Sequence, residues 1–280
     1  MENSLSFFLE DLCFPGRNMD TSSLLDRLAK GTLSWESFLQ KHSKNIQKFS
    51  NAATSVHGHS LMHLAVLANR SDCCEMLLEQ KTHLKYRKNA QGLTPIDLAK
   101  MLSQETILRQ LGAASKKHFS SDPFLYIEDP DHAALDTILY LEHPVFASAY
   151  IFTQVIDLAS KAKTEDLIPT ERIWMGVYFD HELFHGLHPK VRLRWIDSKV
   201  GFGIFANQKI LPCSLVGEYT GHLGELSKEE VSDKRYCAKY AIWGSGKSRL
   251  FIDAEKMGNF TRFINHSAKP NLAMQSVYWR

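Results

Sequence analysis

Residues 258–271 read Gly-Asn-Phe-Thr-Arg-Phe-Ile-Asn-His-Ser-Ala-Lys-Pro-Asn and gather several kinds of polar group into one short segment. Asn265, His266 and Asn271 together offer more donors and acceptors than a plain turn needs. Pro270 restricts the backbone beside them, so these groups are presented in one geometry. A polar turn between two strands is the simpler alternative for this segment taken alone.

A second unusual stretch, residues 199–206, reads KVGFGIFA. Gly201 and Gly203 carry no side chain, so the backbone there can approach a ligand closely. No third glycine follows at the spacing of a dinucleotide-binding loop, and residues 204–206 have the pattern of a strand and not of a helix start. This stretch therefore argues against a dinucleotide site.

Two further stretches lie between these, VGEYTG at residues 216–221 and FIDA at residues 251–254. In chain order the four motifs GxGxFA, GEYTG, IDA and RFINHSxxPN resemble the SET domain, the family of S-adenosylmethionine-dependent protein-lysine methyltransferases. The similarity runs from about Arg192 to Arg280. It implies an α+β chain that ends in a β-rich SET domain of short strands, with S-adenosyl-L-methionine as cofactor.

The resemblance also implies the residues of the site. Those expected to contact or support the cofactor are Val200, Gly201, Phe202, Gly203, Tyr240, Arg262, Phe263, Asn265 and His266. Tyr219 is expected to face the lysine channel, where its ring excludes water and its hydroxyl orients the amine. For Tyr219 and Tyr240, a plain role as core aromatics is the alternative. Methyl transfer depends mainly on positioning and electrostatics, so such a site needs few titratable groups.

The chain departs from the family pattern in three respects. Ala268 stands where many members have a zinc-binding cysteine, and no cysteine-rich segment precedes the domain, so no metal is expected. The segment that supplies the catalytic tyrosine in the family has no counterpart before Arg280, and Tyr278 lies too close to Asn271 to match it. We therefore expect a SET domain that is incomplete at its C-terminus, either as a fragment or as a domain without transfer activity.

The N-terminal part contains a repeat. Residues 58–65 match residues 92–99 in the pattern Gly-x-[Ser/Thr]-x-x-[His/Asp]-Leu-Ala, at an offset of 92 − 58 = 34 residues. This resembles a pair of ankyrin repeats, in which neighbouring units cover each other's apolar faces. Amphipathic helices over residues 21–45 are expected to cap the array. The array either supports the second domain or binds a protein partner.

The boundaries of the domains follow from composition and periodicity. Residues 1–115 are predicted to form the ankyrin-type helical region, residues 116–170 a linker with connecting helices, and residues 171–280 the partial SET domain. The connecting helices are expected over residues 132–142 and 145–163, and a β pattern from Arg172 onward.

A competing motif, His181-Glu182-Leu183-Phe184-His185, fits the H-E-x-x-H pattern of zinc hydrolases. Gly186 and Pro189 leave little length for a helix that would present both imidazoles to one metal. We therefore predict a loop or short turn rich in histidine and treat zinc proteolysis as the weaker alternative.

The composition of the chain argues against several classes of protein. The chain has 44% hydrophobic and 23% charged residues and a net charge of +2, which gives no electrostatic footprint for nucleic acid as a main ligand. Its five cysteines include no CxxC pair, as in a reducing compartment, and Cys73-Cys74 is expected to be buried in a helix. No secretory signal and no membrane span are predicted. We expect a cytoplasmic or nuclear protein, or one secreted into a host cell if bacterial.

The predicted function is methyl transfer from S-adenosylmethionine to a protein lysine, with a histone as one candidate substrate. The alternative is a protein-interaction scaffold in which the repeats carry the function and the SET domain is inactive.

Overall fold

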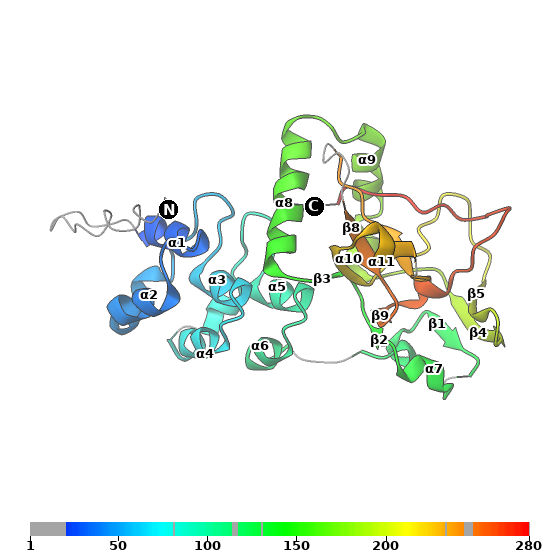
Figure 1. Ribbon diagram of the computed structural model, residues 1–280, viewed down its shortest axis with the longest axis horizontal. Helices are drawn as coiled ribbons and strands as arrows, with labels where there is room; N and C mark the ends of the chain where they lie inside the picture. Colours follow the sequence, from blue (N-terminus) through cyan, green and yellow to red (C-terminus); the bar gives the residue numbers. More distant parts are fainter. Residues whose placement is uncertain are drawn as a thin grey trace, which may run out of the picture. The chain divides into compact units, whose positions relative to one another are not determined.

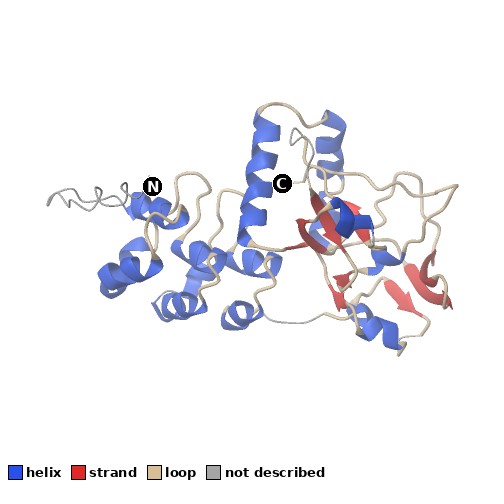
Figure 2. Cartoon of the chain, viewed as in Figure 1, coloured by secondary structure: helices blue, strands red, loops and turns tan. Residues whose placement is uncertain are grey.

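The computed structural model describes residues 21–80, 82–113, 117–129, 131–232, 234–243 and 249–279. Cys13 and the N-terminal segment in which no secretory signal was predicted lie outside these residues. The chain divides into two compact units, residues 1–66 with 72–95 and residues 67–71 with 96–280. Helices build the first unit, whereas the second combines helices with three small sheets (Figures 1 and 2). This mixture of helices and small sheets agrees with the predicted α+β class.

The first unit consists of short helices. They are α1 (Thr21–Ala29), α2 (Trp35–His42), the 3₁₀ segment η1 (Ser43–Phe49), α3 (Leu61–Leu67), α4 (Ser71–Gln80) and η2 (Thr82–Tyr86). The helices predicted over residues 21–45 are present as α1 and α2, and the Ser34 hydroxyl caps α2 by accepting from the Ser37 amide at 3.2 Å. Cys73 and Cys74 are buried in α4, as predicted.

Residues at and just before the starts of the two copies contact each other inside this unit. The Ala90 amide donates to the His57 carbonyl at 2.9 Å, and His63 Nε2 lies 3.0 Å from the Leu93 carbonyl. Ser60 Oγ lies 2.6 Å from His63 Nδ1, which fixes the ring. Helices α5 (Pro95–Met101) and α6 (Glu105–Gln110) begin 34 residues after α3 and α4 (95 − 61 and 105 − 71), the period seen in the sequence. The assignment to the ankyrin class stays a prediction.

The second unit carries the strands. The sheet that contains the two longest described strands has the order β1-β4-β5, from Leu125–Ile127, Val191–Asp197 and Gly201–Ala206. β2 (Leu139–Tyr140) pairs with β9 (Met257–Gly258). The third sheet has the order β3-β6-β8-β7, from Val145–Phe146, His222–Glu225, Leu250–Asp253 and Cys237–Lys239. The helical elements are η3 (Phe119–Ser121), α7 (Ala133–Asp136), α8 (Ala149–Thr164), α9 (Thr170–Tyr178), α10 (Asp180–His185), α11 (Lys228–Ser232) and η4 (Phe260–Phe263).

Several local predictions between residues 113 and 190 are wrong. The expected linker contains β1, and the helix expected over residues 132–142 is only the single turn α7 followed by β2. The helix expected from Val145 begins at Ala149, because Val145 and Phe146 form β3 and pair with β6. The β pattern expected from Arg172 is instead helical in α9 and α10, and strands resume at Val191. Tertiary pairing decides these short segments, since each strand of two or three residues is stable only beside a partner.

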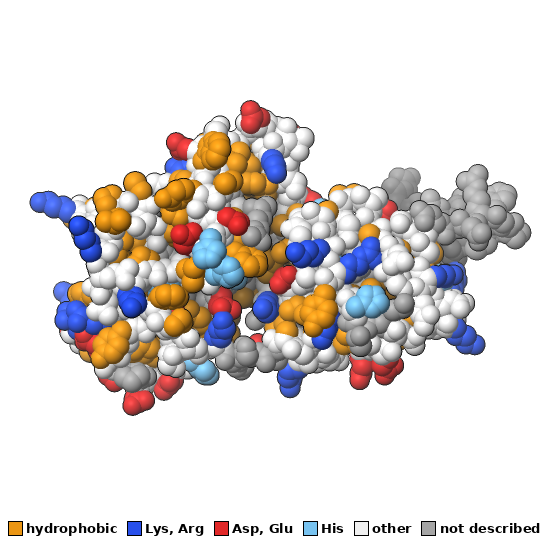
Figure 3. Space-filling view, turned by 180° about the vertical axis from the view of Figure 1, so that it is seen from behind, with side chains coloured by type: hydrophobic (Ala, Val, Ile, Leu, Met, Phe, Trp, Pro, Cys, Tyr) orange, Lys and Arg blue, Asp and Glu red, His pale blue; other side chains and the backbone are white. Residues whose placement is uncertain are grey.

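Large apolar side chains also reach the surface of the second unit. The most exposed on α8 to α10 are Tyr150, Trp174, Val177, Tyr178 and Phe184. In the space-filling view, hydrophobic side chains are interspersed with charged ones over the visible face (Figure 3). Among the described residues, no helix combines the length and the apolar character needed to cross a bilayer.

Candidate functional site

The hairpin of β4 and β5 carries the first predicted site residues. The Asp197 carboxylate closes its turn by accepting from the Lys199 amide at 2.8 Å and the Val200 amide at 2.7 Å. Gly201 follows at φ +79°, a left-handed conformation that residues with a Cβ rarely adopt. The Val200 side chain is 45% exposed at the tip of the hairpin. Val200 and Gly201 therefore shape the turn.

Phe202 and Gly203 present different groups to the two faces of the sheet. Phe202 pairs with Trp195 and its side chain is buried, so only its backbone is available to a ligand. Gly203 lies on the opposite, outward face, where successive residues alternate. A Cβ built on Gly203 would lie 2.6 Å from Ile196 Cδ1 and 3.0 Å from Asn265 Nδ2. A side chain at position 203 would therefore displace Asn265.

Asn265 joins the two motifs that lie farthest apart in the predicted site. Its Nδ2 atom donates to the Phe202 carbonyl at 3.4 Å, although 63 residues separate them. Asn265 is exposed, so its carboxamide lies at the surface above β5. Phe263 packs on the inner side, with its ring centroid 5.4 Å from that of Phe202. The structure thus brings Phe202, Gly203, Phe263 and Asn265 together.

These residues sit on one hydrophobic cluster. Its buried members are Phe119, Leu125, Leu135, Val191, Leu193, Phe202, Phe260 and Phe263. Three of them precede β4, so the segment before the hairpin supplies part of the base of the site. His132, the N-cap of α7, stacks on Trp195 with centroids 4.2 Å apart and adds to the same base.

Arg262 supports the site from within. Its side chain is buried, and Nε donates to the Ala254 carbonyl at 2.7 Å while Nη2 donates to the Glu255 carbonyl at 3.1 Å. The guanidinium lies 4.1 Å from the Tyr236 ring centroid and 4.8 Å from that of Phe263. Burial lowers the pKa of Arg262 from its usual value, although nearby tyrosines and carboxylates act in the opposite direction. Arg262 therefore ties η4 to the segment after β8 and to the Tyr236 ring instead of facing a ligand.

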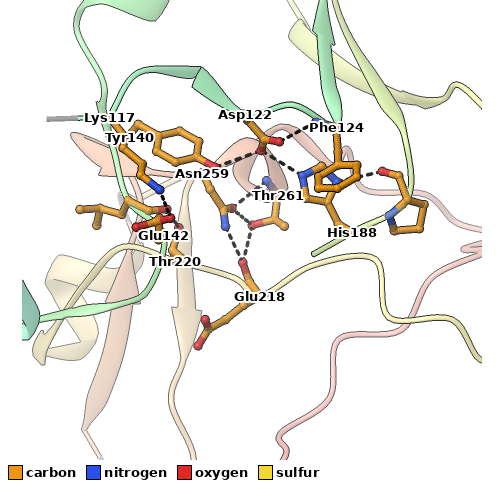
Figure 4. Close-up of polar contacts among 12 residues, drawn as sticks. Lys117, Asp122, Phe124, Tyr140, Glu142, His188, Glu218, Thr220, Asn259 and Thr261 are labelled. Carbon is orange, nitrogen blue, oxygen red and sulfur yellow. Dashed lines mark hydrogen bonds and ion pairs between the residues drawn. The ribbon is translucent and has the colours of Figure 1, made fainter. Parts of the chain in front are cut away.

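The GEYTG motif is tied to η4 by a buried polar cluster (Figure 4). Asn259 Nδ2 donates to the Glu218 carbonyl at 3.0 Å, and the Thr261 hydroxyl lies 3.2 Å from the same oxygen. Asn259 Oδ1 caps η4 by accepting from the Thr261 amide at 3.0 Å. A Cβ on Gly217 would come within 2.8 Å of Thr261 Cγ2, so the close approach requires glycine. Asn259 and Thr261 were not predicted, because their role depends on a segment 41 to 43 residues away.

Gly221 in the same motif gives a direct test of this packing. A Cβ at Gly221 would lie 2.5 Å from the Asp253 carbonyl oxygen, a backbone atom that cannot move without disturbing the pairing of β6 with β8. We expect Gly221→Ala to lower the free energy of unfolding by about 2 kcal/mol. Urea denaturation measures the loss. Gly224→Ala on β6 is the control, because its Cβ would meet only the Ala147 Cβ at 3.2 Å. Equal stability of the two variants would contradict the predicted clash.

Tyr219 and Tyr240 lie in a different cluster from Phe202. Both pack against buried residues of β6, β8 and α8, including Leu223 and Ile252. The Tyr219 hydroxyl donates to the Tyr236 carbonyl at 2.9 Å. Burial raises the pKa of Tyr219 to about 12 and that of Tyr240 to about 12, so both phenols stay protonated near neutral pH. Tyr236 and Arg262 connect Tyr219 with Phe263 in the other cluster.

Two predicted features stand apart. His266 is exposed and makes no hydrogen bond within the described part of the chain. His181 and His185 lie on the six-residue helix α10, not on the predicted loop or turn, with ring centroids 4.8 Å apart. Over the described residues, no group of three or more His, Cys, Asp or Glu side chains could hold a metal ion.

A buried network that the sequence did not reveal underlies the site (Figure 4). Asp122 Oδ2 accepts from the Tyr140 hydroxyl at 3.0 Å and lies 2.9 Å from His188 Nε2, and the two side chains of the ion pair are 5% and 4% exposed. His188 Nδ1 lies 2.8 Å from the Pro189 carbonyl, and its ring packs on Phe260 at 4.2 Å. No local pattern links these residues, because 66 positions separate Asp122 from His188.

The family comparison covers the C-terminal part of the chain. The SET domain model matches residues 201–280. Among curated relatives, histone-lysine N-methyltransferase set-2 of Caenorhabditis elegans is 38% identical over 90 residues, which cover 29% of this chain and 6% of the relative. Histone-lysine N-methyltransferase SETD1B of Homo sapiens is 37% identical over 90 residues, covering 29% and 4%. The Schizosaccharomyces pombe histone-lysine N-methyltransferase, H3 lysine-4 specific, is 41% identical over 76 residues, covering 25% and 8%.

Solved structures give weaker likenesses. Arabidopsis thaliana SUVH6 in complex with SAM has a TM-score of 0.28 and 29% identity, over 34% of this chain and 23% of that one. ATXR5 in complex with histone H3.1 mono-methylated on R26 has a TM-score of 0.30 and 19% identity, over 47% and 63%. The chain thus spans only a small part of the length of its curated relatives. What the sequence comparison does establish is a SET domain at residues 201–280 of this chain.

Proposed function

We propose that the second unit binds S-adenosyl-L-methionine at the surface formed by Phe202, Gly203 and Asn265 and transfers its methyl group to a lysine of a protein. The observation that carries the proposal is the position of the Asn265 carboxamide, next to Gly203 and hydrogen-bonded to the Phe202 carbonyl. The missing side chain at Gly203 lets backbone and amide groups come close together, and such groups suit a ligand with an amino-acid end.

The substrate class rests on the relatives. Those compared above are named histone-lysine methyltransferases, and the SET domain model matches residues 201–280, which hold the site motifs. A protein lysine is therefore the proposed acceptor, and a histone is the first candidate to test. Because the matched segment is a small share of each relative, their partners and full activity are not carried over.

Methyl transfer requires little acid or base catalysis from the side chains of this protein. The sulfonium of the cofactor supplies an electrophilic methyl group, and the acceptor amine must be neutral and aligned with it. Tyr219 stays protonated, because burial raises its pKa to about 12. Its hydroxyl donates to the Tyr236 carbonyl, so its oxygen can accept from an amine N–H and orient it but does not act as a base. The aromatic and aliphatic residues around Tyr219 and Tyr240 exclude water from that side.

Titration calorimetry with S-adenosylmethionine tests the proposal. We expect the wild-type protein to bind and Asn265→Ala to weaken binding at least about tenfold, because the carboxamide would be lost from the amino-acid end of the ligand. Asn207→Ala is the matched control, since Asn207 is an exposed asparagine at the end of the same hairpin. A methylation assay with histone H3 and with a non-histone lysine peptide follows.

Two outcomes would contradict this function. A folded wild-type protein that does not bind S-adenosylmethionine would leave the protein-interaction scaffold as the better account. Binding that Asn265→Ala and Asn207→Ala weaken equally would place the cofactor elsewhere. Circular dichroism of each variant excludes unfolding as the cause of a lost signal.

A further inference from the structure

The outward face of β4 and β5 carries a guanidinium beside Gly203, in the proposed binding surface. Arg192, Arg194 and Ile196 point outward from β4, because Val191 and Leu193 on alternate positions are buried. Arg194 pairs in register with Gly203, the residue over which Asn265 lies. Arg194, Gly203 and Asn265 therefore share one side of the sheet.

Arg194 is held in place without a charged partner. Its guanidinium carbon lies 4.2 Å from the centroid of the Phe205 ring, within the range of a cation–π contact. Within the described residues, Arg194 makes no hydrogen bond or ion pair. An exposed arginine that is oriented by stacking keeps all its N–H donors available to a ligand.

Arg192, on the same strand, differs from Arg194 in its contacts. Arg192 lies two residues earlier on the same strand and also faces Phe205, but at 5.9 Å. Its Nε atom lies 3.1 Å from Glu128 Oε1, so its charge is already paired. The two arginines thus differ in availability and not in charge or strand.

Two acceptors also lie beside Gly203, the Phe202 carbonyl and Asn265 Oδ1. The Phe202 carbonyl faces the Asn265 amide, and Asn265 Oδ1 has no hydrogen-bond partner among the described residues. An α-ammonium group needs acceptors of this kind, whereas an α-carboxylate needs a donor pair such as a guanidinium supplies. The outward side chain of Ile196, 40% exposed, gives an apolar surface on the same strand.

We infer that Arg194, oriented by Phe205, binds the α-carboxylate of the methionine part of S-adenosylmethionine, while the Phe202 carbonyl and Asn265 Oδ1 receive its α-ammonium group. This inference rests on the proposed function. It makes Arg194 a specificity-determining residue for ligands with a free amino-acid end and leaves the adenosine part to other residues.

The test compares three ligands with and without the amino-acid end. S-adenosylmethionine and S-adenosylhomocysteine carry it, and 5′-methylthioadenosine lacks it. Calorimetry on the full chain should show that Arg194→Gln weakens the first two about tenfold and leaves 5′-methylthioadenosine unchanged, as expected for one charge-assisted contact at an exposed site. Arg192→Gln removes the same charge from the same face and should change none of the three. Arg194→Lys should recover part of the affinity, because the charge remains but the paired donors do not.

Each outcome is decisive. Unchanged affinity of Arg194→Gln for S-adenosylmethionine overturns the assignment, and so does an equal loss for 5′-methylthioadenosine or an equal effect of Arg192→Gln. A wild-type protein that binds none of the three ligands overturns the proposed function together with this inference. Retained binding of 5′-methylthioadenosine by Arg194→Gln also shows that the variant is folded.

Discussion

Replacing Asp122 by alanine should lower the free energy of unfolding by about 3 kcal/mol near pH 7, because it leaves the buried His188 ring without its carboxylate partner. Asp122 and His188 are 5% and 4% exposed, so little solvent is available to replace the lost contact. The Tyr140 hydroxyl would lose its acceptor at the same time. The network joins the segment before α7 to the start of β4 and to Phe260, so the loss should reach the whole second unit.

The contribution of Asp122 to the stability of the fold should be lost as the pH falls. Burial alone would raise the pKa of Asp122, but hydrogen bonds from His188, Phe124 and Tyr140 and the charge of His188 outweigh it and lower the pKa from its usual value. A carboxyl group with a lowered folded-state pKa stabilises the fold fully above its unfolded pKa. That contribution disappears as pH falls below about 3.8 toward the folded-state pKa.

Urea unfolding between neutral pH and about pH 3 measures both effects. Asp122→Asn should retain the size of the side chain and lack the acid-dependent component. Asp136→Ala, at an exposed aspartate on α7, is the control and should remain within about 0.5 kcal/mol of wild type. If Asp122→Ala and Asp136→Ala unfold at the same urea concentration, the buried pair does not stabilise the fold.

The motifs predicted the centre of the site better than its surroundings. Gly203, Phe202 and Asn265 meet although Asn265 lies more than 60 positions along the chain, because motifs of this kind mark points where backbones must pass closely. The glycines of GEYTG have the same physical cause, since Gly217 and Gly221 leave no room for a Cβ. The side chain of Phe202, by contrast, belongs to the core, a distinction that spacing alone does not make.

The elements before β4 were harder to predict. β1, β2 and β3 have two or three residues each and pair with strands 66 to 118 positions later (191 − 125 and 257 − 139). Such segments have no periodicity of their own, and their structure is decided by the partner strand. The Asp122–His188 pair was missed for the same reason. The sequence does not distinguish Arg194 from Arg192, two positions earlier on the same strand; its contact with Phe205 and its register with Gly203 do.

The second large effect is expected at Arg262, where Arg262→Met should lower the free energy of unfolding by about 3 kcal/mol. Methionine fills much of the volume but donates no hydrogen bond, so the carbonyls of Ala254 and Glu255 each lose a donor at a cost of about 1–3 kcal/mol. The contacts with the rings of Tyr236 and Phe263 lose their cationic component as well.

The same substitution should also weaken the support of two site residues, Asn265 and Tyr219. Phe263 lies under Phe202, and the Tyr236 carbonyl accepts the Tyr219 hydroxyl, so Arg262→Met loosens the support of Asn265 and of Tyr219 together. We expect weaker binding of S-adenosylmethionine at a temperature where the variant is still folded, by about tenfold. Arg235→Met removes an exposed positive charge and should leave both properties unchanged. If Arg262→Met is destabilised while its affinity stays that of wild type, Arg262 supports the fold alone and the pocket is organised without it.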